Sequence, residues 1–462
     1  MIVANFINGT AVSADETSPL VDPAAGEEFG RAVVSRAAEV DAAVQAAADA
    51  FPTWSRTTPG ERQLALLKLA DLLEANAEAV ADAEIRETGK IRAVVLGEEI
   101  PQCVDQIRFF AGAARALGTA AAGEYVSGAT SYQRREPVGV IAQITPWNYP
   151  LMMAVWKIAP ALAAGNTVVV KPADTTPSST VLLASLAARV LPAGVFNVVL
   201  GDRDTGRLLV EHPVPAMVSL TGSTRAGVEV ARSAATTVKR THLELGGNAP
   251  VLVFDDVDVA SAAEGIVGAA FYNAGQDCTA ATRVLVHSAV HDEFVAALVK
   301  AASAQVPGTD FGPLNSAAQL DRVLTMLGRS SATVHCGGKR YGSTGFFLEP
   351  TVISGLAQED ELVQEEPFAP VITVQSFGSD DEAVELANGV PQGLASSIWT
   401  RDTSRAAALT TRLDFGIVWV NTHGLVASEM PHGGFGASGY GKDLSMHGLE
   451  DYTRVKHVMI AH

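Results

Sequence analysis

The stretch Thr167-Val-Val-Val-Lys171-Pro-Ala-Asp174 decides the fold class of this chain. A short β-branched run of this kind is typical of a strand buried inside a parallel sheet. The lysine and the aspartate follow at its carboxyl end, which is the edge where open α/β sheets bind their ligands. We therefore expect a parallel sheet with a ligand site beside Lys171 and Asp174.

Comparable runs lie on both sides of this stretch and are separated by segments of helical character. A first series lies at 138–144, 196–200, 216–220 and 251–254, and a second lies at 283–287, 371–377, 396–400 and 417–421. This alternation is the rhythm of repeated βαβ units, so the fold class is α/β. Apolar spacing of three and four predicts helices over 37–51, 59–89 and 98–117, the last kinked or started at Pro101.

Two segments break this rhythm. Residues 118–135 alternate like an exposed two-stranded segment, and 451–460 alternate polar and apolar residues like a further strand.

Composition limits the function. A chain of 462 residues exceeds one hydrophobic core, so two or three domains are expected. A formal net charge of −18 argues against nucleic acid as a partner, because a phosphate backbone requires clustered Lys and Arg. It is compatible with a cationic substrate, although an acidic surface is also ordinary.

The expected location is the cytoplasm. Three cysteines do not make a disulfide framework, and the first residues lack the basic and apolar regions of a signal peptide. The most apolar stretch, 151–170, is interrupted by Lys157, Pro160 and Asn166, so no membrane span is expected.

Two reactive residues stand in frames of small residues: Glu244 in Leu-Glu-Leu-Gly-Gly and Cys278 in Gly-Gln-Asp-Cys-Thr. A carboxylate near a cysteine raises the pKa of the thiol and weakens the nucleophile. The pair therefore suggests chemistry in stages, with the cysteine acting first and the carboxylate later. Alternatively, Cys278 is a small packing residue, the role we assign to Cys103 and Cys336.

A dinucleotide site is indicated although the G-x-G-x-x-G fingerprint is absent. Asp174 can accept hydrogen bonds from ribose hydroxyls, and Lys171 can reach the same sugar or a phosphate. The turn Thr221-Gly222-Ser223 follows a strand and opens a helix, where free backbone N–H groups suit a pyrophosphate. A Ser that merely caps the helix is the alternative.

Seven motifs in order along the chain resemble those of the NAD(P)-dependent aldehyde dehydrogenases. They are Ile144-Thr-Pro-Trp-Asn148-Tyr-Pro, Gly165-Asn-Thr-Val-Val-Val-Lys171-Pro, Leu220-Thr-Gly-Ser-Thr224, Glu244-Leu-Gly-Gly247, Gly275-Gln-Asp-Cys278, Glu365-Glu-Pro-Phe-Ala-Pro370 and Met430-Pro-His-Gly-Gly-Phe-Gly-Ala-Ser-Gly439. Within that family, the segments 108–115, 120–125, 439–443 and 450–458 most resemble the γ-aminobutyraldehyde dehydrogenases, relatives of the betaine-aldehyde dehydrogenases.

The resemblance implies a role for each catalytic residue. Cys278 would attack the aldehyde carbon, and the Asn148 amide with the Cys278 backbone N–H would hold the oxyanion. Hydride transfer would leave a thioester that Glu244 hydrolyses by activating water. As an alternative, Asn148 could cap a helix.

NAD is the implied cofactor, with NADP use possible because Asp174 stands where a longer glutamate is usual. The implied cofactor-binding residues are Thr145, Pro146, Trp147, Lys171, Asp174, Gly201, Thr221, Gly222, Ser223, Leu245, Gly246, Glu366 and Phe368. Glu366 would hold the nicotinamide ribose, or else be a surface acid. Pro367 and Ala369 replace the usual Ile and Gly, which could displace Glu366. No metal is expected.

The substrate implied is a small cationic aldehyde, best 4-aminobutanal. The expected substrate-binding residues are Tyr149, Trp156, Glu99 and Asp277, with Asp105 about two turns beyond Glu99. The two aromatic residues could instead be core, and Glu99 a solvated face. His432 replaces a tryptophan of betaine-aldehyde enzymes, which favours a primary amine.

The resemblance also implies three structural units. These are a Rossmann-like coenzyme-binding domain of 1–118 and 138–246, a catalytic α/β domain of 247–441, and an oligomerisation hairpin of 119–137 joined by the C-terminal strand of 442–462. Exposed edge strands need a cover, so a homodimer or homotetramer is expected.

Several rival functions follow from the same residues. They are a betaine-aldehyde or broad-range neutral aldehyde dehydrogenase, a CoA-acylating enzyme, a non-redox cysteine hydrolase and a non-catalytic homologue. Retention of Cys278, Glu244 and Asn148 argues against the last. A hydrolase would need a histidine partner in a recognisable motif, and the sequence has none.

Overall fold

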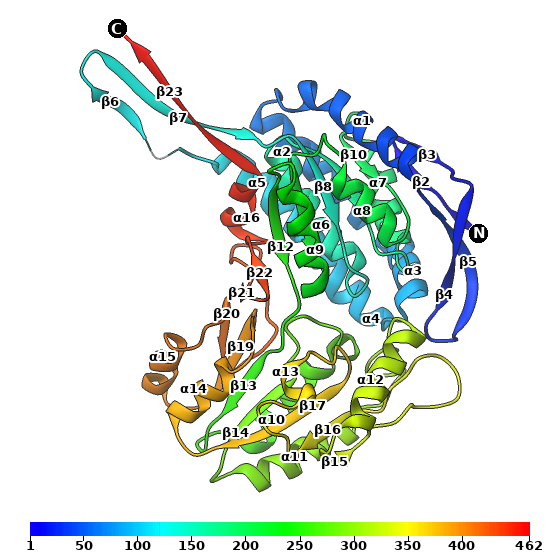
Figure 1. Cartoon of the computed structure of the whole chain (residues 1–462), viewed down its shortest axis with the longest axis vertical. Coiled ribbons are helices and arrows are strands. Elements are labelled where there is room, and N and C mark those ends of the chain that lie inside the picture. The colour runs from blue at the N-terminus through cyan, green and yellow to red at the C-terminus, as the bar shows by residue number, and fades with distance from the viewer. Residues whose placement is uncertain (120) are drawn as a thin grey trace.

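The computed structural model describes residues 1–119 and 121–462. Two large α/β halves lie one above the other, and a narrow arm of strands projects from the half that contains the N-terminus (Figure 1). Within the described residues, no helix is both long and apolar enough to cross a membrane.

The upper half is built on an eight-stranded sheet in the order β22-β12-β11-β8-β9-β10-β2-β3. Its strands are β2 (Asn5–Ile7), β3 (Thr10–Val12), β8 (Val140–Ile144), β9 (Thr167–Lys171), β10 (Phe196–Val198), β11 (Met217–Thr221), β12 (Arg240–Glu244) and β22 (Gly439–Tyr440). The five strands from β12 to β10 are parallel. The chain runs outward from β8 in both directions, so β8 and β11 flank a topological switch point.

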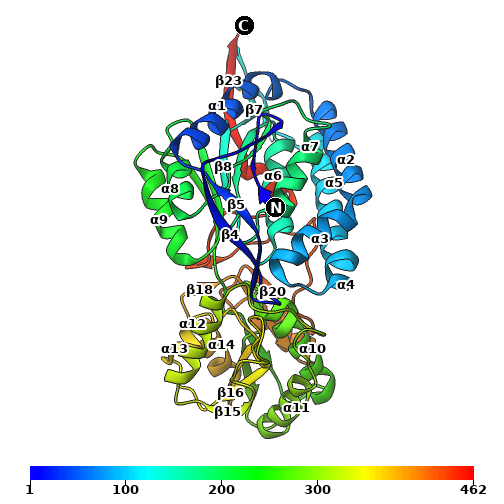
Figure 2. The same cartoon turned by 90° about the vertical axis from the view of Figure 1, so that its right-hand side faces the viewer.

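Helices cover both faces of this sheet, which explains why the quoted run has no polar face (Figures 1 and 2). Val168 and Val170 pack in one core with α2, α5, α6 and α7, whereas Val169 packs in another with α1, α8 and α9. The helices are α1 (Ala37–Trp54), α2 (Pro59–Ala75), α3 (Ala77–Thr88), α4 (Arg92–Val94), α5 (Ile100–Ala116), α6 (Pro150–Ala163), α7 (Ser178–Ala187), α8 (Arg203–Glu211), α9 (Thr224–Ala235) and α16 (Ser445–Asp451).

The lower half contains a seven-stranded sheet in the order β15-β16-β17-β14-β13-β19-β20, parallel except for β15. The strands are β13 (Pro250–Val253), β14 (Arg283–His287), β15 (Thr333–Cys336), β16 (Thr351–Ser354), β17 (Val371–Phe377), β19 (Ala395–Trp399) and β20 (Ile417–Val420). Its helices are α10 (Val259–Phe271), α11 (His291–Ser303), α12 (Ala317–Arg329), α13 (Glu361–Gln364), α14 (Asp380–Asn388) and α15 (Thr403–Thr410). A short ribbon pairs β18 (Gln392–Gly393) with β21 (Phe435–Gly436).

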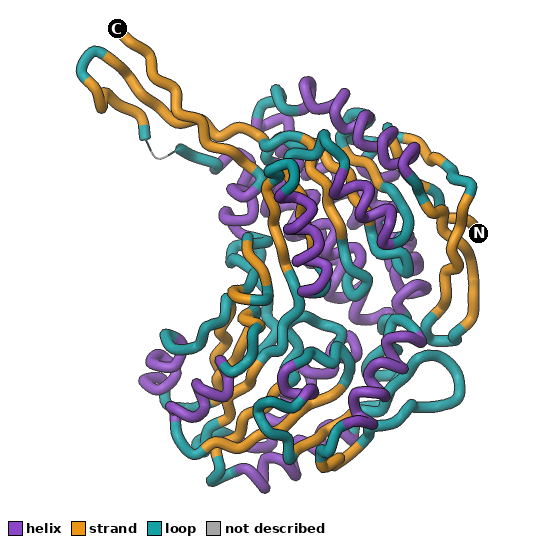
Figure 3. The backbone as a smooth tube through the Cα atoms, viewed as in Figure 1, coloured by secondary structure: helices purple, strands orange, loops and turns teal. Residues whose placement is uncertain are grey.

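The arm consists of β6 (Ala122–Val126), β7 (Ala129–Pro137) and β23 (Thr453–Ala461). Strand β7 is central, and β23 pairs with it over its whole length, from Thr453 opposite Pro137 to Ala461 opposite Ala129 (Figure 3). The hairpin and the C-terminal strand that the sequence predicts are therefore present. Ala120, inside the predicted hairpin segment, lies outside the described residues.

The N-terminal strands connect the two halves. The hairpin of β4 (Glu16–Asp22) and β5 (Glu27–Val34), with β1 (Ile2–Val3), forms a separate sheet. Its turn reaches the lower half, where the Phe346 backbone N–H donates to the Pro23 carbonyl. Sequence analysis did not predict β1 to β5.

Several further predictions need correction. Predicted helix 59–89 breaks into α2 and α3 at Asn76, whose side-chain amide donates to the Leu72 carbonyl and competes with the helix. Strand β12 was also not predicted. The predicted catalytic domain ends at 441, yet β22 pairs with β12 in the upper sheet because Gly439 lies beside Glu244. The rest of the predicted domain division stays a prediction.

A buried cluster of charged residues binds the segment around α16 to α6 and β12. Lys157 of α6 lies 3.2 Å from Asp443, and His242 of β12 lies 3.2 Å from Asp443 and 3.0 Å from Asp451. Burial disfavours the charged imidazole, but the two carboxylates outweigh burial and raise the pKa of His242 to about 9.

This pKa shift predicts a dependence of stability on pH. In an unfolded chain, histidine titrates near pH 6.5, so the ion pairs of His242 stabilise the fold fully below about pH 6.5. That contribution, on the order of 3 kcal/mol, is lost as pH rises toward 9. We expect the melting temperature of His242→Gln to fall less between pH 6.5 and 9 than that of the unchanged protein, as measured by scanning calorimetry. The exposed His457→Gln is the control, and an equal fall in all three proteins contradicts the prediction.

Candidate active site

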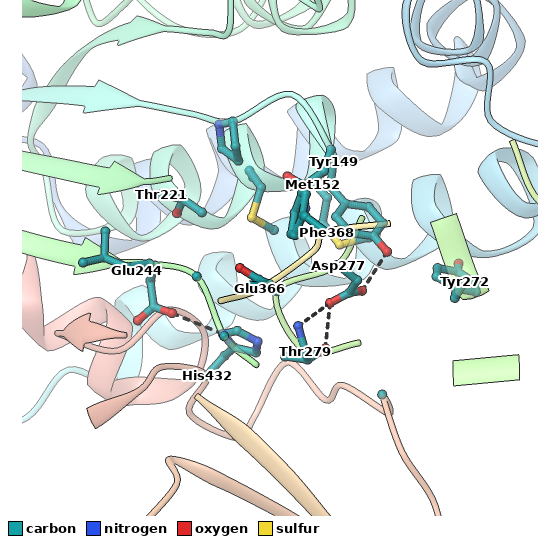
Figure 4. A pocket seen from close by; sticks show the side chains of 18 of the residues that line it. Tyr149, Met152, Thr221, Glu244, Tyr272, Asp277, Thr279, Glu366, Phe368 and His432 are labelled. Atoms are coloured by element: carbon teal, nitrogen blue, oxygen red, sulfur yellow. Dashed lines mark hydrogen bonds and ion pairs between the residues drawn. The ribbon is translucent and has the colours of Figure 1, made fainter. Parts of the chain in front are cut away.

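A cavity of about 990 Å³ lies between the carboxyl ends of β8 and β11 and the loop that carries Cys278. Its walls come from both halves of the molecule, with Tyr149, Thr221 and Glu244 from the upper half and Asp277 and Glu366 from the lower half (Figure 4). Most of the residues predicted to bind cofactor and substrate therefore share one cavity with the predicted nucleophile and base.

The loop that carries Cys278 is fixed by an unusual backbone and by buried amides. Asn273, Ala274 and Gly275 have positive φ, and an added Cβ on Gly275 would collide with the Ala369 carbonyl. The Gln276 side chain donates to the Pro313 carbonyl at 3.1 Å and accepts from the Asn315 backbone at 2.8 Å. A loop anchored in this way presents Cys278, which is partly exposed, to the cavity.

Cys278 is surrounded by negative charge. Burial raises the pKa of its thiol, and Asp277, Glu366 and Glu244 raise it further. The Cys278 backbone N–H opposes this rise, because a hydrogen bond to the sulfur favours the thiolate. In this state Cys278 is a thiol, so a proton must leave before the sulfur attacks.

Glu244 ends strand β12, and the residues after it explain the Leu-Gly-Gly frame. An added Cβ on Gly246 would lie 2.6 Å from a Glu366 oxygen, and one on Gly247 would collide with the Cys278 carbonyl. Gly247 therefore has no room for a side chain against the nucleophile loop, and Gly246 lets the Glu366 carboxylate lie close to the chain. Burial raises the pKa of Glu244, and the nearby His432 opposes that shift.

Asn148 lies beside the nucleophile loop and does not cap a helix. Its side-chain amide donates to the Gln276 carbonyl at 3.0 Å, and its own carbonyl accepts from Asn273 at 2.9 Å. It is buried and lines the cavity. The Asn148 amide therefore contacts the nucleophile loop two residues before Cys278, and its role as oxyanion donor stays a prediction.

Nine of the predicted cofactor residues line the cavity: Pro146, Trp147, Thr221, Gly222, Ser223, Leu245, Gly246, Glu366 and Phe368. Trp147 and Phe368 face each other edge to face at 5.3 Å. Glu366 accepts from the Gly247 backbone N–H, and burial raises the pKa of its carboxyl. Ser223 also caps α9, accepting from the Ala226 backbone at 3.3 Å, so the two interpretations of this residue are compatible.

The other four predicted cofactor residues continue along the same sheet edge beyond the cavity wall. Thr145 donates its backbone N–H to the Lys171 carbonyl at 3.2 Å. Lys171 is buried, which lowers the pKa of its ammonium, while the nearby Asp174 is exposed. Gly201 follows β10 with φ +148°.

Unsatisfied groups at this edge fit a polar cofactor. Among the described residues, the buried hydroxyls of Thr145 and Thr221 have no hydrogen-bond partner. Such groups are costly unless a ligand or water completes them. The Glu366 loop is fixed despite Pro367 and Ala369. Gln319 donates to the Phe368 carbonyl at 2.9 Å, and Arg322 donates to the Pro367 carbonyl at 2.6 Å.

Three of the four predicted substrate residues line the cavity. Tyr149 donates its hydroxyl to Asp277 at 2.7 Å, and the second Asp277 oxygen accepts from the Thr279 backbone and hydroxyl, each at 2.7 Å. Trp156 packs edge to face against His432 at 4.7 Å. Tyr149 and Trp156 are at once core residues and cavity wall.

Glu99 is a correction. It is only 3% exposed and does not line the cavity; instead it forms an ion pair with the buried Lys90 at 2.7 Å. Glu98 lines the cavity in its place and accepts from the Tyr272 hydroxyl at 3.1 Å. A turn of π-helix at Val95–Glu99 changes the helical register just before α5. Asp105 is bound by the Ser428 hydroxyl at 2.6 Å and does not line the cavity either.

Sequence analysis missed several wall residues besides Glu98. They are Gln102, Met152, Met153, Arg225, Tyr272, Gln319, Arg322 and the segment 423–426. The two methionines follow the Asn148-Tyr149-Pro150 motif directly, which was the available signal. Among the described residues, no imidazole is hydrogen-bonded to the Cys278 sulfur: His423 bonds the Thr279 carbonyl, and His432 faces Glu244.

Known proteins match the chain over almost its entire length. The model of the aldehyde dehydrogenase family matches residues 11–458. A betaine aldehyde dehydrogenase of Mesorhizobium japonicum is 38% identical over 99% of this chain and 97% of that protein.

Solved structures agree with this match. An indole-3-acetaldehyde dehydrogenase of P. syringae, in complex with NAD+ and IAA, has a TM-score of 0.97 and 34% identity over 99% of this chain and 96% of that chain. A betaine aldehyde dehydrogenase of Staphylococcus aureus in complex with NAD+ has a TM-score of 0.96 and 33% identity over 99% of this chain and 97% of that chain. With the nucleophile, base and dinucleotide edge around one cavity, the chain belongs to the aldehyde dehydrogenase family and is an oxidoreductase of that family.

Proposed function

We propose that this aldehyde dehydrogenase oxidises an ω-aminoaldehyde, best 4-aminobutanal to 4-aminobutanoate, with NAD as the acceptor. The observation that carries the substrate proposal is the charge of the cavity wall near Cys278. Glu98 and Asp277 line it, and the cations lining the cavity among the described residues are Arg225 and Arg322, on the coenzyme side. A substrate ammonium group would meet carboxylates in a partly desolvated cavity, where the attraction between ammonium and carboxylate is stronger than in water.

The side chains around Asp277 make it the stronger candidate for binding an ammonium group. Its three hydrogen bonds, from Tyr149 and Thr279, keep the carboxylate in place in the cavity wall. One face of the Tyr149 ring is already occupied, since the Lys90 ammonium lies 4.1 Å from the ring centre. Charge pairing with Asp277 and Glu98 therefore supports recognition more than a cation–π contact with Tyr149 does.

The reaction follows from the residues around the cavity. The Cys278 sulfur forms a bond to the aldehyde carbon, and the oxyanion is held by the Asn148 amide and the Cys278 backbone N–H. NAD, when bound, would supply the acceptor for the hydride from that carbon, and the substrate would remain on Cys278 as a thioester. Glu244 then takes a proton from water, the hydroxide adds to the acyl carbon, and the carbon–sulfur bond breaks to release the acid.

Glu244 supports hydrolysis over transfer to CoA. Its carboxylate lines the same cavity as Cys278 and lies close enough to raise the pKa of the thiol. A base in that position can take a proton from the water that attacks the thioester. Asp174, exposed beside Lys171, would repel a 2′-phosphate and so favours NAD over NADP.

Betaine aldehyde is the second candidate substrate, because two of the similar proteins bear that name. The same carboxylates would attract its fixed positive charge. His432 favours the primary amine over a quaternary one, since an aromatic cage binds the latter best. A neutral aldehyde is the third candidate, in line with the similar indole-3-acetaldehyde enzyme.

The arm supports a homodimer or homotetramer. Its outer strands β6 and β23 expose Tyr125, Val126, Val455 and Ile460, each more than half accessible. Unpaired strand edges with apolar side chains are suited to a partner subunit. The three free cysteines are compatible with the proposed cytoplasmic location.

Steady-state reduction of NAD and NADP tests the substrate proposal. With NAD, we expect a higher kcat/KM for 4-aminobutanal than for betaine aldehyde or butanal, and a lower value with NADP. Cys278→Ala abolishes the reaction because the nucleophile is lost. A preference for butanal leaves the enzyme class intact and contradicts the proposed ammonium site.

Two charge-removing variants locate the ammonium site. Asp277→Asn lowers kcat/KM for 4-aminobutanal relative to butanal by about 5- to 30-fold, equivalent to about 1–2 kcal/mol at a partly buried position. Glu98→Gln, at an exposed carboxylate, lowers that ratio by about 2- to 5-fold.

The ratio of the two substrates is the decisive readout. Asp277→Asn also removes a charge that raises the pKa of Cys278, so butanal oxidation does not fall. The matched control is Glu293→Gln, on the exposed face of α11. If both site variants change the two substrates equally, Asp277 and Glu98 do not bind the ammonium group.

A further inference from the structure

His432 is the side chain in direct contact with Glu244. Its Nδ1 lies 3.4 Å from Glu244 Oε2, and both residues are nearly inaccessible to solvent (Figure 4). Among the described residues, neither His432 Nδ1 nor Glu244 Oε1 has a hydrogen-bond partner. The imidazole therefore faces the carboxylate from within the cavity wall.

The position of the His432 ring is fixed from two sides. Its backbone N–H donates to the Asp443 carbonyl at 2.9 Å, and its carbonyl accepts from the Asp443 N–H at 2.8 Å. Its ring packs edge to face on Trp156 at 4.7 Å. The next residue, Gly433, leaves room for the carboxylate, because an added Cβ would collide with Glu244 Oε1.

The other charged groups near Glu244 favour its ionised form less than His432 does. From its own strand, His242 favours the charged form of Glu244; from the segment before α16, Asp443 opposes it. Lys442 attracts Glu244 but donates its ammonium to the Gly433 carbonyl. Lys157 of α6 is paired with Asp443, while Cys278 and Glu366 share the cavity with Glu244. The greatest influence that favours the charged form of Glu244 is His432.

We propose that His432 is the positioning residue of the base: its imidazole N–H donates to Glu244 and holds the carboxylate ionised and aimed at the water that hydrolyses the thioester. In that step the water proton goes to Glu244 and the hydroxide to the acyl carbon. The sulfur leaves as a thiolate and then recovers a proton. The proposal rests on the role of Glu244 in the proposed function, and it is independent of which aldehyde is the substrate.

Two substitutions separate the hydrogen bond from the packing. His432→Phe keeps a ring against Trp156 and removes the donor, whereas His432→Asn supplies an uncharged N–H donor. The full-length enzyme with NAD and its best aldehyde is quenched in acid during turnover. Intact-mass spectrometry then gives the fraction of protein that carries the acyl group, and steady-state rates are measured from pH 5.5 to 9.

We expect the acylated fraction to rise in His432→Phe, with a turnover number about 10-fold lower at pH 7. The acid limb of its kcat profile moves to higher pH, because loss of His432 removes the largest influence that opposes the effect of burial on the pKa of Glu244. The first turnover of NADH formation changes less than twofold. His432→Asn recovers much of the turnover and accumulates less acyl-enzyme than His432→Phe.

Glu244→Gln distinguishes failure of this proposal from failure of the proposed function. If Glu244→Gln accumulates acyl-enzyme and His432→Phe does not, His432 has no part in positioning the base. If Glu244→Gln itself accumulates none, Glu244 is not the base of hydrolysis and both proposals fall. Identical pH profiles for His432→Phe and the unchanged enzyme also overturn the role of His432.

Discussion

The site depends on one constraint: Cys278, the predicted nucleophile, shares its cavity with several carboxylates, and three of them, Asp277, Glu366 and Glu244, act directly on its thiol. Burial and these charges raise the pKa of Cys278, and burial also raises the pKa of Glu244 and Glu366. Tyr149 and Thr279 donate to Asp277, the Gly247 N–H donates to Glu366, and the His432 imidazole faces Glu244 at 3.4 Å. Because these carboxylates have different neighbours, they can lie close together without competing for one shared partner.

Backbone geometry makes this crowding possible. Gly246 and Gly247 bring the base strand against Glu366 and the nucleophile loop. Gly275 lets that loop pass the Ala369 carbonyl, while Phe368 adopts a φ of +54° in the opposing segment. Strain of this kind persists only where surrounding contacts fix it, and here Gln319 and Arg322 bind the carbonyls of that segment.

The sequence predicts much of this arrangement because its signals are local. Strand β9 has the predicted bounds, since a three-valine run between a sheet-edge lysine and a glycine-asparagine turn is unambiguous. The motifs predict Cys278, Glu244 and Asn148 as catalytic residues by their frames, and the structure places all three in the wall of one cavity. Strand β12 escaped prediction because four of its five residues, Arg-Thr-His-Leu-Glu, are polar, so it lacks the apolar run of the other buried strands.

Glu99 shows what local reasoning does not reach. The family resemblance places Glu99 at the substrate, but a π-helical turn precedes α5, Glu98 lines the cavity, and Glu99 pairs with Lys90. The residues of this turn, Val-Leu-Gly-Glu-Glu, contain no local signal that distinguishes a π-helix from an α-helix. Likewise, the pairing of His432 with Glu244 joins residues 188 positions apart and becomes visible only when the sheet is assembled.

The C-terminal segment has a consequence for recombination between related enzymes. Within residues 439–461, the chain supplies a strand beside Glu244, the Asp443 that bonds the His432 backbone, the Asp451 that binds His242, and the outer strand of the arm. A chimera that exchanges only the strands of the arm would combine a β23 from one enzyme with the Asp443, Asp451 and Glu244 of the other. The exchangeable module therefore consists of 122–137 and 439–461 together with His242 and His432, so assembly and the chemistry of the base are inherited as one unit.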